Sequence, residues 1–338
     1  MSRCKKIKPL LSILVFLLLF FPALSRCTLI LADKNHTLVA PFYNEKRNSL
    51  DVLFVGSSHA YHGITPMEIW HEYGIPGYVL GSASQTIPLS YYLIKEGIRT
   101  QHPKVIVLEA FGAYYKKDYK NAGSVHHAID AIPYNLTKLE IFCEFLPRTL
   151  SLYEEMEYIF PVSIYHDRWD SLTENDYNGK PPYMKGHTFS FRAKPFTEPR
   201  AITAAKAVSE GTVTYFEKIV ALCRKTGTQL LILQVPSADG KTYKYTHKRT
   251  NTLFEMAKEA GVPVVDFEVL REDCPFDYSA DFSNATHMNT LGAEKVSHWL
   301  GAYLKEQYEL PDRREDPAYS GWNNDYELYR AHRDKLMK

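Results

Sequence analysis

In the stretch Leu50-Asp-Val-Leu-Phe-Val-Gly-Ser-Ser-His-Ala60, a run of apolar residues ends in a glycine and two adjacent serines. A short apolar run bounded by turn residues is typical of a buried strand. Far downstream, the stretch Asp281-Phe-Ser-Asn-Ala-Thr-His-Met-Asn289 supplies a histidine and an acidic residue. A hydroxyl, an imidazole base and a carboxylate are the groups needed for acyl transfer through a covalent ester. The two stretches together predict serine-dependent acyl chemistry.

From Leu50 onward, short apolar runs alternate with helical patterns. We expect strands at 51–55, 77–80, 105–108, 230–235 and 262–266. Helices are expected at 65–73, 88–99, 212–226, 250–260 and 290–308, the third and fourth closed by Gly227 and Gly261. This alternation predicts an α/β fold with a doubly wound, mostly parallel, five-stranded sheet.

Polar residues follow the predicted strands and do not precede them. In open parallel sheets the ligand crevice lies beyond the carboxyl ends of the strands, so this placement favours a site at that edge. The groups expected there are Ser57 and Ser58 after the first strand, Gly81 after the second, Glu109 after the third, Ser237 after the fourth and His287 in the connection after the fifth.

Composition and charge limit the function classes. The chain has 338 residues, of which 45% are hydrophobic, so it is able to bury a full core. Five Lys and Arg residues and no acidic residue precede residue 28, which leaves the remainder with a net charge near −4. A nucleic-acid partner would call for a basic face, so none is expected.

The N-terminal segment predicts entry into the secretory membrane. The run from Pro9 to Ser25 carries no charge and follows a basic cluster. Its length is at the short limit for a spanning helix, which leaves two readings open. We favour an uncleaved anchor, and the alternative is a signal peptide cut after Ala23-Leu24-Ser25. Either reading places the rest of the chain outside the cytoplasm.

The motifs resemble those of the SGNH (GDSL) hydrolase superfamily. Gly56-Ser57-Ser58-His59 is similar to its Gly-Asp-Ser block with serine in place of the aspartate, and Leu80-Gly81-Ser82 to the block that supplies its glycine. His287-Met288-Asn289 resembles its terminal histidine block. The anchor and the pattern Tyr165-His-Asp-Arg-Trp169 look most like Gram-positive cell-envelope members, akin to the D-alanine transfer proteins and the alginate-type O-acetyltransferases.

The resemblance implies a role for each matching residue. Ser58 would be the nucleophile, His287 the general base and later the general acid, and the N–H groups of Ser58 and Gly81 the oxyanion hole. Ser57, His59, Glu109 and Asn284 are expected to lie beside the site. The alternative for Ser58 is an ordinary helix N-cap, because serine is favoured there whatever the function.

Two departures from the family pattern affect the details. The acidic residue often found three positions before the histidine is Asn284 in this chain. An amide there holds the histidine tautomer but does not offset the positive charge that grows on the imidazole. We expect Asp281 to supply the missing carboxylate, with Asp277 and Glu109 as alternatives. The other departure is the absence of a Gly-x-Asn-Asp block after the third strand, where the chain reads Leu108-Glu-Ala-Phe-Gly112.

The regular alternation stops between Tyr114 and Phe196, where 16 of 83 residues are aromatic. We expect an insertion that covers the site as a lid. The predicted organisation is a signal or anchor segment at 1–27, a linker at 28–49, an SGNH-like catalytic domain at 50–113 and 197–310, the insertion at 114–196 and a C-terminal tail at 311–338.

Three functions remain open at this point. The first is an O-acyltransferase acting on an envelope polysaccharide or teichoic-type polymer, with a multi-spanning membrane O-acyltransferase as the acyl donor. The second is a carbohydrate or lipid esterase with the same residues, and the third is a catalytically decayed binding or scaffold protein. No cofactor is implied, because no phosphate-cradling glycine loop follows a strand. No metal site is expected either, since the residues around His59 and His62 lack the spacing of a zinc site.

Overall fold

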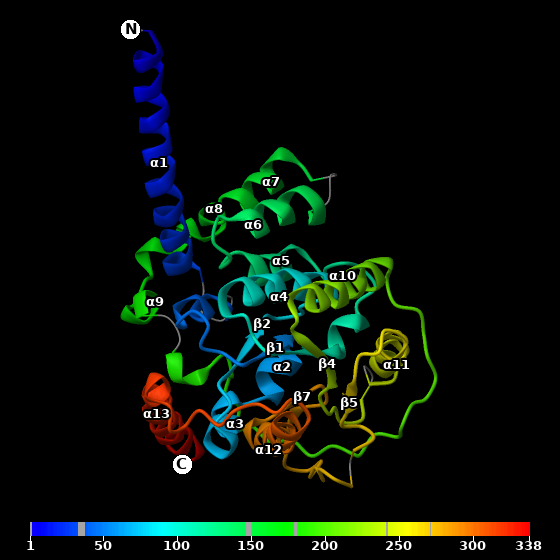
Figure 1. Ribbon diagram of the computed structural model, residues 1–338. Coiled ribbons are helices and arrows are strands. Elements are labelled where there is room, and N and C mark those ends of the chain that lie inside the picture. The colour runs from blue at the N-terminus through cyan, green and yellow to red at the C-terminus, as the bar shows by residue number, and fades with distance from the viewer. Residues whose placement is uncertain (1, 33–37, 147–149, 179–180, 241–242, 271) are drawn as a thin grey trace.

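A computed structural model describes residues 2–32, 38–146, 150–178, 181–240, 243–270 and 272–338. Its centre is a parallel five-stranded sheet of order β2-β1-β3-β4-β5, covered by helices on both faces (Figure 1). The strands are β1 (Val52–Gly56), β2 (Gly77–Gly81), β3 (Val105–Glu109), β4 (Gln229–Gln234) and β5 (Val264–Asp266). The predicted doubly wound α/β fold and its five strands are confirmed.

The sheet is parallel and buried because its strands are apolar on both faces. In β1, Leu53 and Val55 join one core cluster, while Val52 and Phe54 join the cluster on the opposite face. The first cluster includes residues of α4 (Ile87–Gln101), α10 (Glu210–Thr226) and α11 (Tyr243–Glu259). The second cluster includes residues of α2 (Ser58–Gly63) and α12 (Thr290–Gln307).

The five predicted helices are present, with shifted ends. The first corresponds to α3 (Pro66–Tyr73), and α11 begins seven residues before the predicted start at 250. Gly227 ends α10 with a left-handed backbone (φ 71°), as its position in the sequence predicts. Two short features were not predicted: α2 directly after β1, and the antiparallel pair β6 (Phe282–Asn284) and β7 (His287–Met288).

The insertion at 114–196 folds mainly as short helices. They are α5 (Ala122–Ile129), α6 (Leu136–Glu140), α7 (Leu152–Ile159), α8 (Val162–Tyr165) and α9 (Glu174–Asn178), with short turns of helix at η2 (Ala110–Tyr114), η3 (Ile141–Phe145), η4 (His166–Asp170) and η5 (Pro182–Met184). Val125, Ile129 and Phe145 join the core cluster of α4. In Figure 1, α5, α6 and α7 lie beyond α4, toward the N-terminal helix.

The apolar faces of α5 and η3 are buried against the α4 side of the sheet, and the lid role of the insertion stays a prediction. The last part of the insertion runs past the carboxyl edge. There, the N–H of Thr188 donates to the carbonyl of Tyr61 (3.0 Å) and the N–H of Lys194 donates to the carbonyl of Phe282 (3.0 Å).

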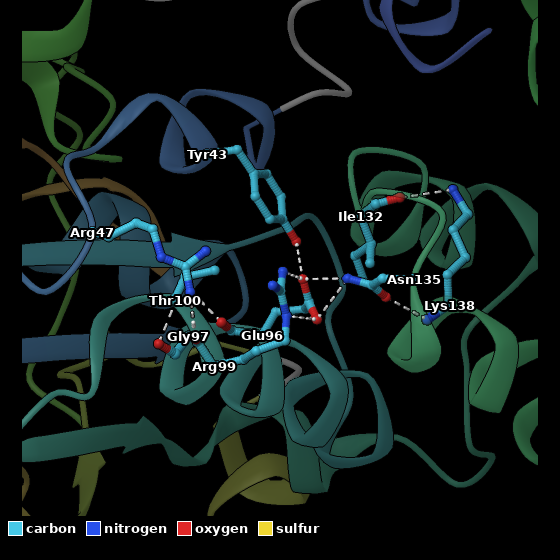
Figure 2. A network of polar contacts seen from close by, with 9 residues as sticks. All are labelled: Tyr43, Arg47, Glu96, Gly97, Arg99, Thr100, Ile132, Asn135 and Lys138. Carbon is cyan, nitrogen blue, oxygen red and sulfur yellow. Dashed lines mark hydrogen bonds and ion pairs between the residues drawn. The ribbon is translucent and has the colours of Figure 1, made fainter. Parts of the chain in front are cut away.

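A buried carboxylate joins the insertion to the domain (Figure 2). Glu96 of α4 has a side chain with 0% exposure and accepts hydrogen bonds from the Tyr43 hydroxyl (3.1 Å), Arg99 (2.9 Å) and Asn135 (3.1 Å). Asn135 also caps α6, where its Oδ1 accepts from the N–H of Lys138 (3.0 Å). Tyr43 belongs to η1 (Ala40–Asn44), so three distant segments meet at Glu96.

The N-terminal helix α1 (Ser2–Leu31) is the one described helix long and apolar enough to cross a membrane, over Lys8–Leu31. This is consistent with a signal anchor or a signal peptide. Its end packs on the insertion: the Phe21 and Tyr134 rings are 4.8 Å apart, and Arg168 donates to the carbonyl of Leu31 (2.7 Å). Of the predicted linker at 28–49, residues 33–37 lie outside the described residues.

The C-terminal segment packs back on the domain. It forms η6 (Pro317–Tyr319) and α13 (Ser320–Met337), and α13 lies against α3. The Trp70 and Trp322 rings are 5.1 Å apart. The Tyr329 side chain is fully buried, and its hydroxyl is 2.8 Å from Oγ1 of the buried Thr65.

Replacing Tyr329 with Phe should leave the buried Thr65 hydroxyl without this partner. We expect Tyr329→Phe to lower the free energy of unfolding by about 1–3 kcal/mol, the usual cost of an unsatisfied buried polar group. Urea denaturation measures the change. Tyr326→Phe on the same helix is the control, because the Tyr326 hydroxyl forms no hydrogen bond with the described residues, and it should change the free energy by far less. Equal losses in both variants would contradict the assignment.

Candidate active site

The turn between β1 and α2 presents two serines with different roles. Ser57 is the N-cap of α2, and its hydroxyl accepts a hydrogen bond from the N–H of His59 (3.3 Å). Ser58 is the first helical residue, so its hydroxyl is not used as the cap. The capping role that the sequence left open for Ser58 is therefore taken by Ser57.

A buried glutamate stabilises this turn through hydrogen bonds. Glu109 at the end of β3 has 1% exposure. Its Oε2 accepts from the hydroxyl (3.0 Å) and the N–H (3.3 Å) of Ser57, and its Oε1 accepts from the N–H of Phe111 (2.7 Å). Burial raises the pKa of Glu109 to about 7, although the hydrogen bonds from Phe111 and Ser57 act to lower it. A Cβ at Gly56 would lie 2.5 Å from the Glu109 Cβ, so the close approach requires glycine.

The histidine reaches this turn from the other end of the chain. His287 lies on β7, which pairs with β6 through the register Asn284↔His287. The Nε2 atom of His287 is 2.7 Å from the Oγ of Ser58. The structure thus brings together the two residues on which the acyl-transfer hypothesis depends, although 229 positions separate them.

Asn284 determines which imidazole nitrogen carries the proton. Its Oδ1 accepts from the N–H groups of Thr286 (3.0 Å) and His287 (3.0 Å), so the oxygen and not the amide nitrogen faces the imidazole. The same oxygen lies 3.1 Å from Nδ1 of His287. Nδ1–H therefore donates to Asn284, and Nε2 is left to accept from the Ser58 hydroxyl. Burial lowers the pKa of His287 to about 4, which keeps the imidazole neutral at pH 7.

Asp281 does not lie where the sequence analysis expected it. Asp281 is 2% exposed. Its carboxylate accepts hydrogen bonds from Lys295 of α12 (2.6 Å) and from the N–H of Asp277 (2.7 Å). Asp277 in turn accepts from Ser279, and Glu109 faces the β1–α2 turn. Among the described residues, no carboxylate forms a hydrogen bond with Nδ1 of His287. The difference arises because the short β6–β7 hairpin places the side-chain amide of Asn284, and not a carboxylate, beside Nδ1 of His287.

The two expected oxyanion donors lie close to each other. Gly81 at the end of β2 is in register with Gly56, and a Cβ at Gly81 would be 2.8 Å from the carbonyl oxygen of Gly56. The N–H of Ser58 is in the first turn of α2, where no earlier carbonyl of the helix is available to it. Both N–H groups therefore belong to the same corner of the sheet edge as the Ser58 hydroxyl.

Aromatic and imidazole rings surround this corner, and of these only His59 was expected there from the sequence. His59 is 2% exposed and stacks on Phe111, with ring centroids 3.7 Å apart. The rings of His59 and His62 lie 5.0 Å and 5.3 Å from that of His287. Burial lowers the pKa of His59 well below its usual value, and the imidazoles of His287 and His62 add to the effect.

Tyr61 also borders the site. Burial raises the pKa of Tyr61 to about 12, with a hydrogen bond to Ser58 acting in the opposite direction. Prediction of a helix at 58–63 would have placed Tyr61 and His62 one turn from Ser58. Within the described ranges, no three His, Cys, Asp or Glu side chains are grouped so as to hold a metal ion.

Comparisons with known proteins give matches to solved structures at low identity. No protein-family model and no curated protein matches the chain. A solved structure of a protein assigned to the G-D-S-L lipolytic family, from Desulfitobacterium hafniense DCB-2, matches at 10% identity and a TM-score of 0.39, over 74% of this chain and 97% of that chain. A protein assigned as an acylhydrolase, from Bacteroides fragilis NCTC 9343, matches at 10% identity and a TM-score of 0.39, over 79% and 93%.

The raised pKa of Glu109 predicts a pH dependence of stability. Because the pKa is about 7 in the folded chain and 4.5 ordinarily, the stabilising contribution is fully present below about pH 4.5 and is lost as the pH rises to 7. We expect Glu109→Gln to remove this dependence, which amounts to roughly 1–3 kcal/mol between pH 4.5 and 7. Urea denaturation at several pH values tests this.

The exposed Glu155→Gln is the control for that experiment and should leave the pH dependence of the wild type unchanged. Parallel curves for the wild type and Glu109→Gln across the range would mean that Glu109 is ionised throughout.

Proposed function

We propose that the chain is an extracytoplasmic O-acyltransferase that modifies a cell-envelope glycopolymer through an acyl-Ser58 intermediate. The observation that carries the proposal is the 2.7 Å contact between Oγ of Ser58 and Nε2 of His287. A nucleophile within hydrogen-bonding reach of a base, with the base oriented by a third group, is the arrangement of acyl-transfer enzymes. Asn284 is that third group.

In the first half-reaction the Ser58 oxygen attacks the carbonyl carbon of the acyl donor, and its proton passes to Nε2 of His287. The negative charge that develops on the carbonyl oxygen is stabilised by the N–H groups of Ser58 and Gly81. The tetrahedral species collapses when the bond to the leaving group breaks. His287 returns the proton to that group, and the acyl chain remains as an ester on Ser58.

In the second half-reaction a sugar or polyol hydroxyl takes the place of the leaving group. His287 removes its proton, the hydroxyl oxygen attacks the acyl-Ser58 carbonyl, and the proton then returns to the Ser58 oxygen as the new ester departs. Water in place of this hydroxyl makes the same residues an ester hydrolase. The acceptor alone separates the two functions.

An amide in place of the usual carboxylate has a consequence for the rate. The imidazolium formed in each half-reaction lies 3.1 Å from a neutral oxygen, so no negative charge offsets it. In enzymes with a carboxylate at this position, its replacement by an amide lowers kcat about 10⁴-fold, largely because the tautomer is then wrong. Here the acceptor oxygen of Asn284 keeps the correct tautomer. We infer slow but specific turnover. The role of Asp281 is then structural, because its carboxylate holds the segment before β6 by binding Lys295 and the N–H of Asp277.

An N-terminal helix that stays attached as a membrane anchor favours transfer over hydrolysis. Phe21 of α1 precedes the Ala23-Leu24-Ser25 segment and packs on Tyr134 of the insertion, a contact that cleavage of the leader would remove. Retention of α1 would tether the domain that carries Ser58 to the membrane, where a multi-spanning membrane O-acyltransferase would deliver the acyl group.

Labelling of the detergent-solubilised protein with a fluorophosphonate probe tests the nucleophile. We expect a covalent adduct at Ser58, identified by mass spectrometry, that is lost in Ser58→Ala and kept in Ser57→Ala. His287→Ala should slow the reaction by about 10²-fold or more, because the base is lost. Asp281→Asn should react at nearly the wild-type rate. An adduct that persists in Ser58→Ala would contradict the proposal, and so would no adduct in a folded sample beside a reactive serine hydrolase.

The same sample separates transfer from hydrolysis. With p-nitrophenyl acetate as donor, a glycopolymer acceptor should accelerate nitrophenol release and carry the acetyl group afterwards. Acetate as the sole product at every acceptor concentration would assign the esterase function instead.

A further inference from the structure

A hollow beside the candidate active site is lined by cations and tyrosines. It has a volume of about 340 Å³ and is formed by Tyr114, Tyr115, Lys116, Lys206, Tyr245 and Arg249. The first three follow β3 through η2, the last two are on α11, and Lys206 lies in the segment before α10. No carboxylate lines this hollow, so its net charge is positive.

Arg249 is the unusual member of this group. It is 5% exposed, yet among the described residues its guanidinium has neither an ion-pair partner nor a hydrogen-bond partner. Three other described cations of low exposure have partners: Arg333 pairs with Glu294, Lys185 pairs with Glu45, and Lys138 donates to the carbonyls of Asp130 and Ile132. An arginine does not lose its proton in a protein, and a buried charge without a partner is costly. The energetics therefore favour an anionic ligand in the hollow.

The aromatic rings provide a surface that suits a sugar or polyol. The guanidinium carbon of Arg249 lies 6.0 Å from the centroid of the Tyr114 ring, which holds the charge beside an aromatic face. Tyr245 is 55% exposed at the mouth of the hollow. Aromatic faces pack against the carbon skeleton of a ligand, while arginine binds carboxylate or phosphate oxygens with two parallel hydrogen bonds.

Two packed rings, those of Phe111 and His59, lie between the hollow and the catalytic imidazole. Phe111 stacks on His59 (3.7 Å between centroids) and also contacts Tyr114 (5.4 Å) and Tyr115 (6.1 Å). His59 in turn lies 5.0 Å from His287. These ring contacts link the hollow to the catalytic imidazole.

We propose that this hollow binds a phosphate or carboxylate group of the acyl acceptor, so that the acceptor is an anionic polymer of sugar or polyol units. Arg249 binds the anion, Lys116 and Lys206 at the rim attract it, and the tyrosines pack on the adjoining unit. The assignment of the ligand as acceptor rests on the proposed function, whereas anion binding by the hollow does not require it.

Binding to the full-length, detergent-solubilised Ser58→Ala protein tests the inference without turnover. Isothermal titration compares a glycerol phosphate oligomer, a galacturonate oligomer and a neutral dextran oligomer of similar length. At least one anionic oligomer should bind about tenfold or more tightly than the neutral one, as expected for one charge-assisted contact. Preference between the two identifies the anion as phosphate or carboxylate. Equal affinity for all three would overturn the proposal.

Variants of the hollow should weaken anion binding selectively. We expect Arg249→Gln to lower the affinity about tenfold or more and Arg249→Lys to lower it less. The double variant Lys116→Gln/Lys206→Gln alters only exposed side chains and keeps the test valid if Arg249→Gln does not fold. The control is Lys117→Gln/Lys244→Gln, which removes two exposed lysines outside the hollow. An equal loss in the control would indicate general charge attraction and overturn the proposal.

Failure of this inference and failure of the proposed function are distinguishable. Loss of anion selectivity with normal fluorophosphonate labelling of Ser58 would refute anion binding by the hollow and leave the proposed acyl chemistry standing. Selective anion binding without labelling of Ser58 would support anion binding by the hollow and refute the proposed acyl chemistry.

Discussion

The hydrogen bond from the Ser58 hydroxyl to Nε2 of His287 joins the first βα turn to the connection that follows the last strand of the sheet. It forms only if β1 ends where α2 begins and if the β6–β7 hairpin meets that turn. Glu109 fixes the first condition through Ser57, and Asn284 fixes the second by binding the main chain of the hairpin and the imidazole together. The paired side chains are therefore held by the sheet and the hairpin, and not by their own contact alone.

The site has less fixed charge than a triad with a carboxylate. Position 57 is a serine, asparagine occupies the place beside Nδ1 of His287, and burial raises the pKa of Glu109 to about 7. The neighbouring imidazole of His59 is kept neutral by burial. The strongest uncompensated charge nearby is Arg249, on the other side of Phe111. This arrangement separates proton transfer at the serine from recognition of an anionic group in the hollow.

The sequence predicted much of the fold and part of the site, for identifiable reasons. The strands were found because their apolar runs are buried on both faces, and Ser58 and His287 because reactive groups gather at the carboxyl edge of such a sheet. Asp281 was misplaced because its pairing with Lys295 depends on tertiary packing against α12. The hairpin β6–β7 is too short to give a periodic signal. Arg249 gave none either, since its burial depends on contacts between α11 and the segment after β3.

An NMR titration of the ring nitrogens of His287, assigned by comparison with His287→Gln, reports which nitrogen carries the proton beside Ser58. We expect a proton on Nδ1 and none on Nε2 at neutral pH, and a titration midpoint near pH 4 instead of the usual 6.5. Asn284→Asp should raise that midpoint, because a carboxylate then faces Nδ1. A proton on Nε2 at neutral pH, or a titration midpoint near pH 6.5 in the wild type, would contradict a hydrogen bond from the Ser58 hydroxyl to a buried, neutral His287.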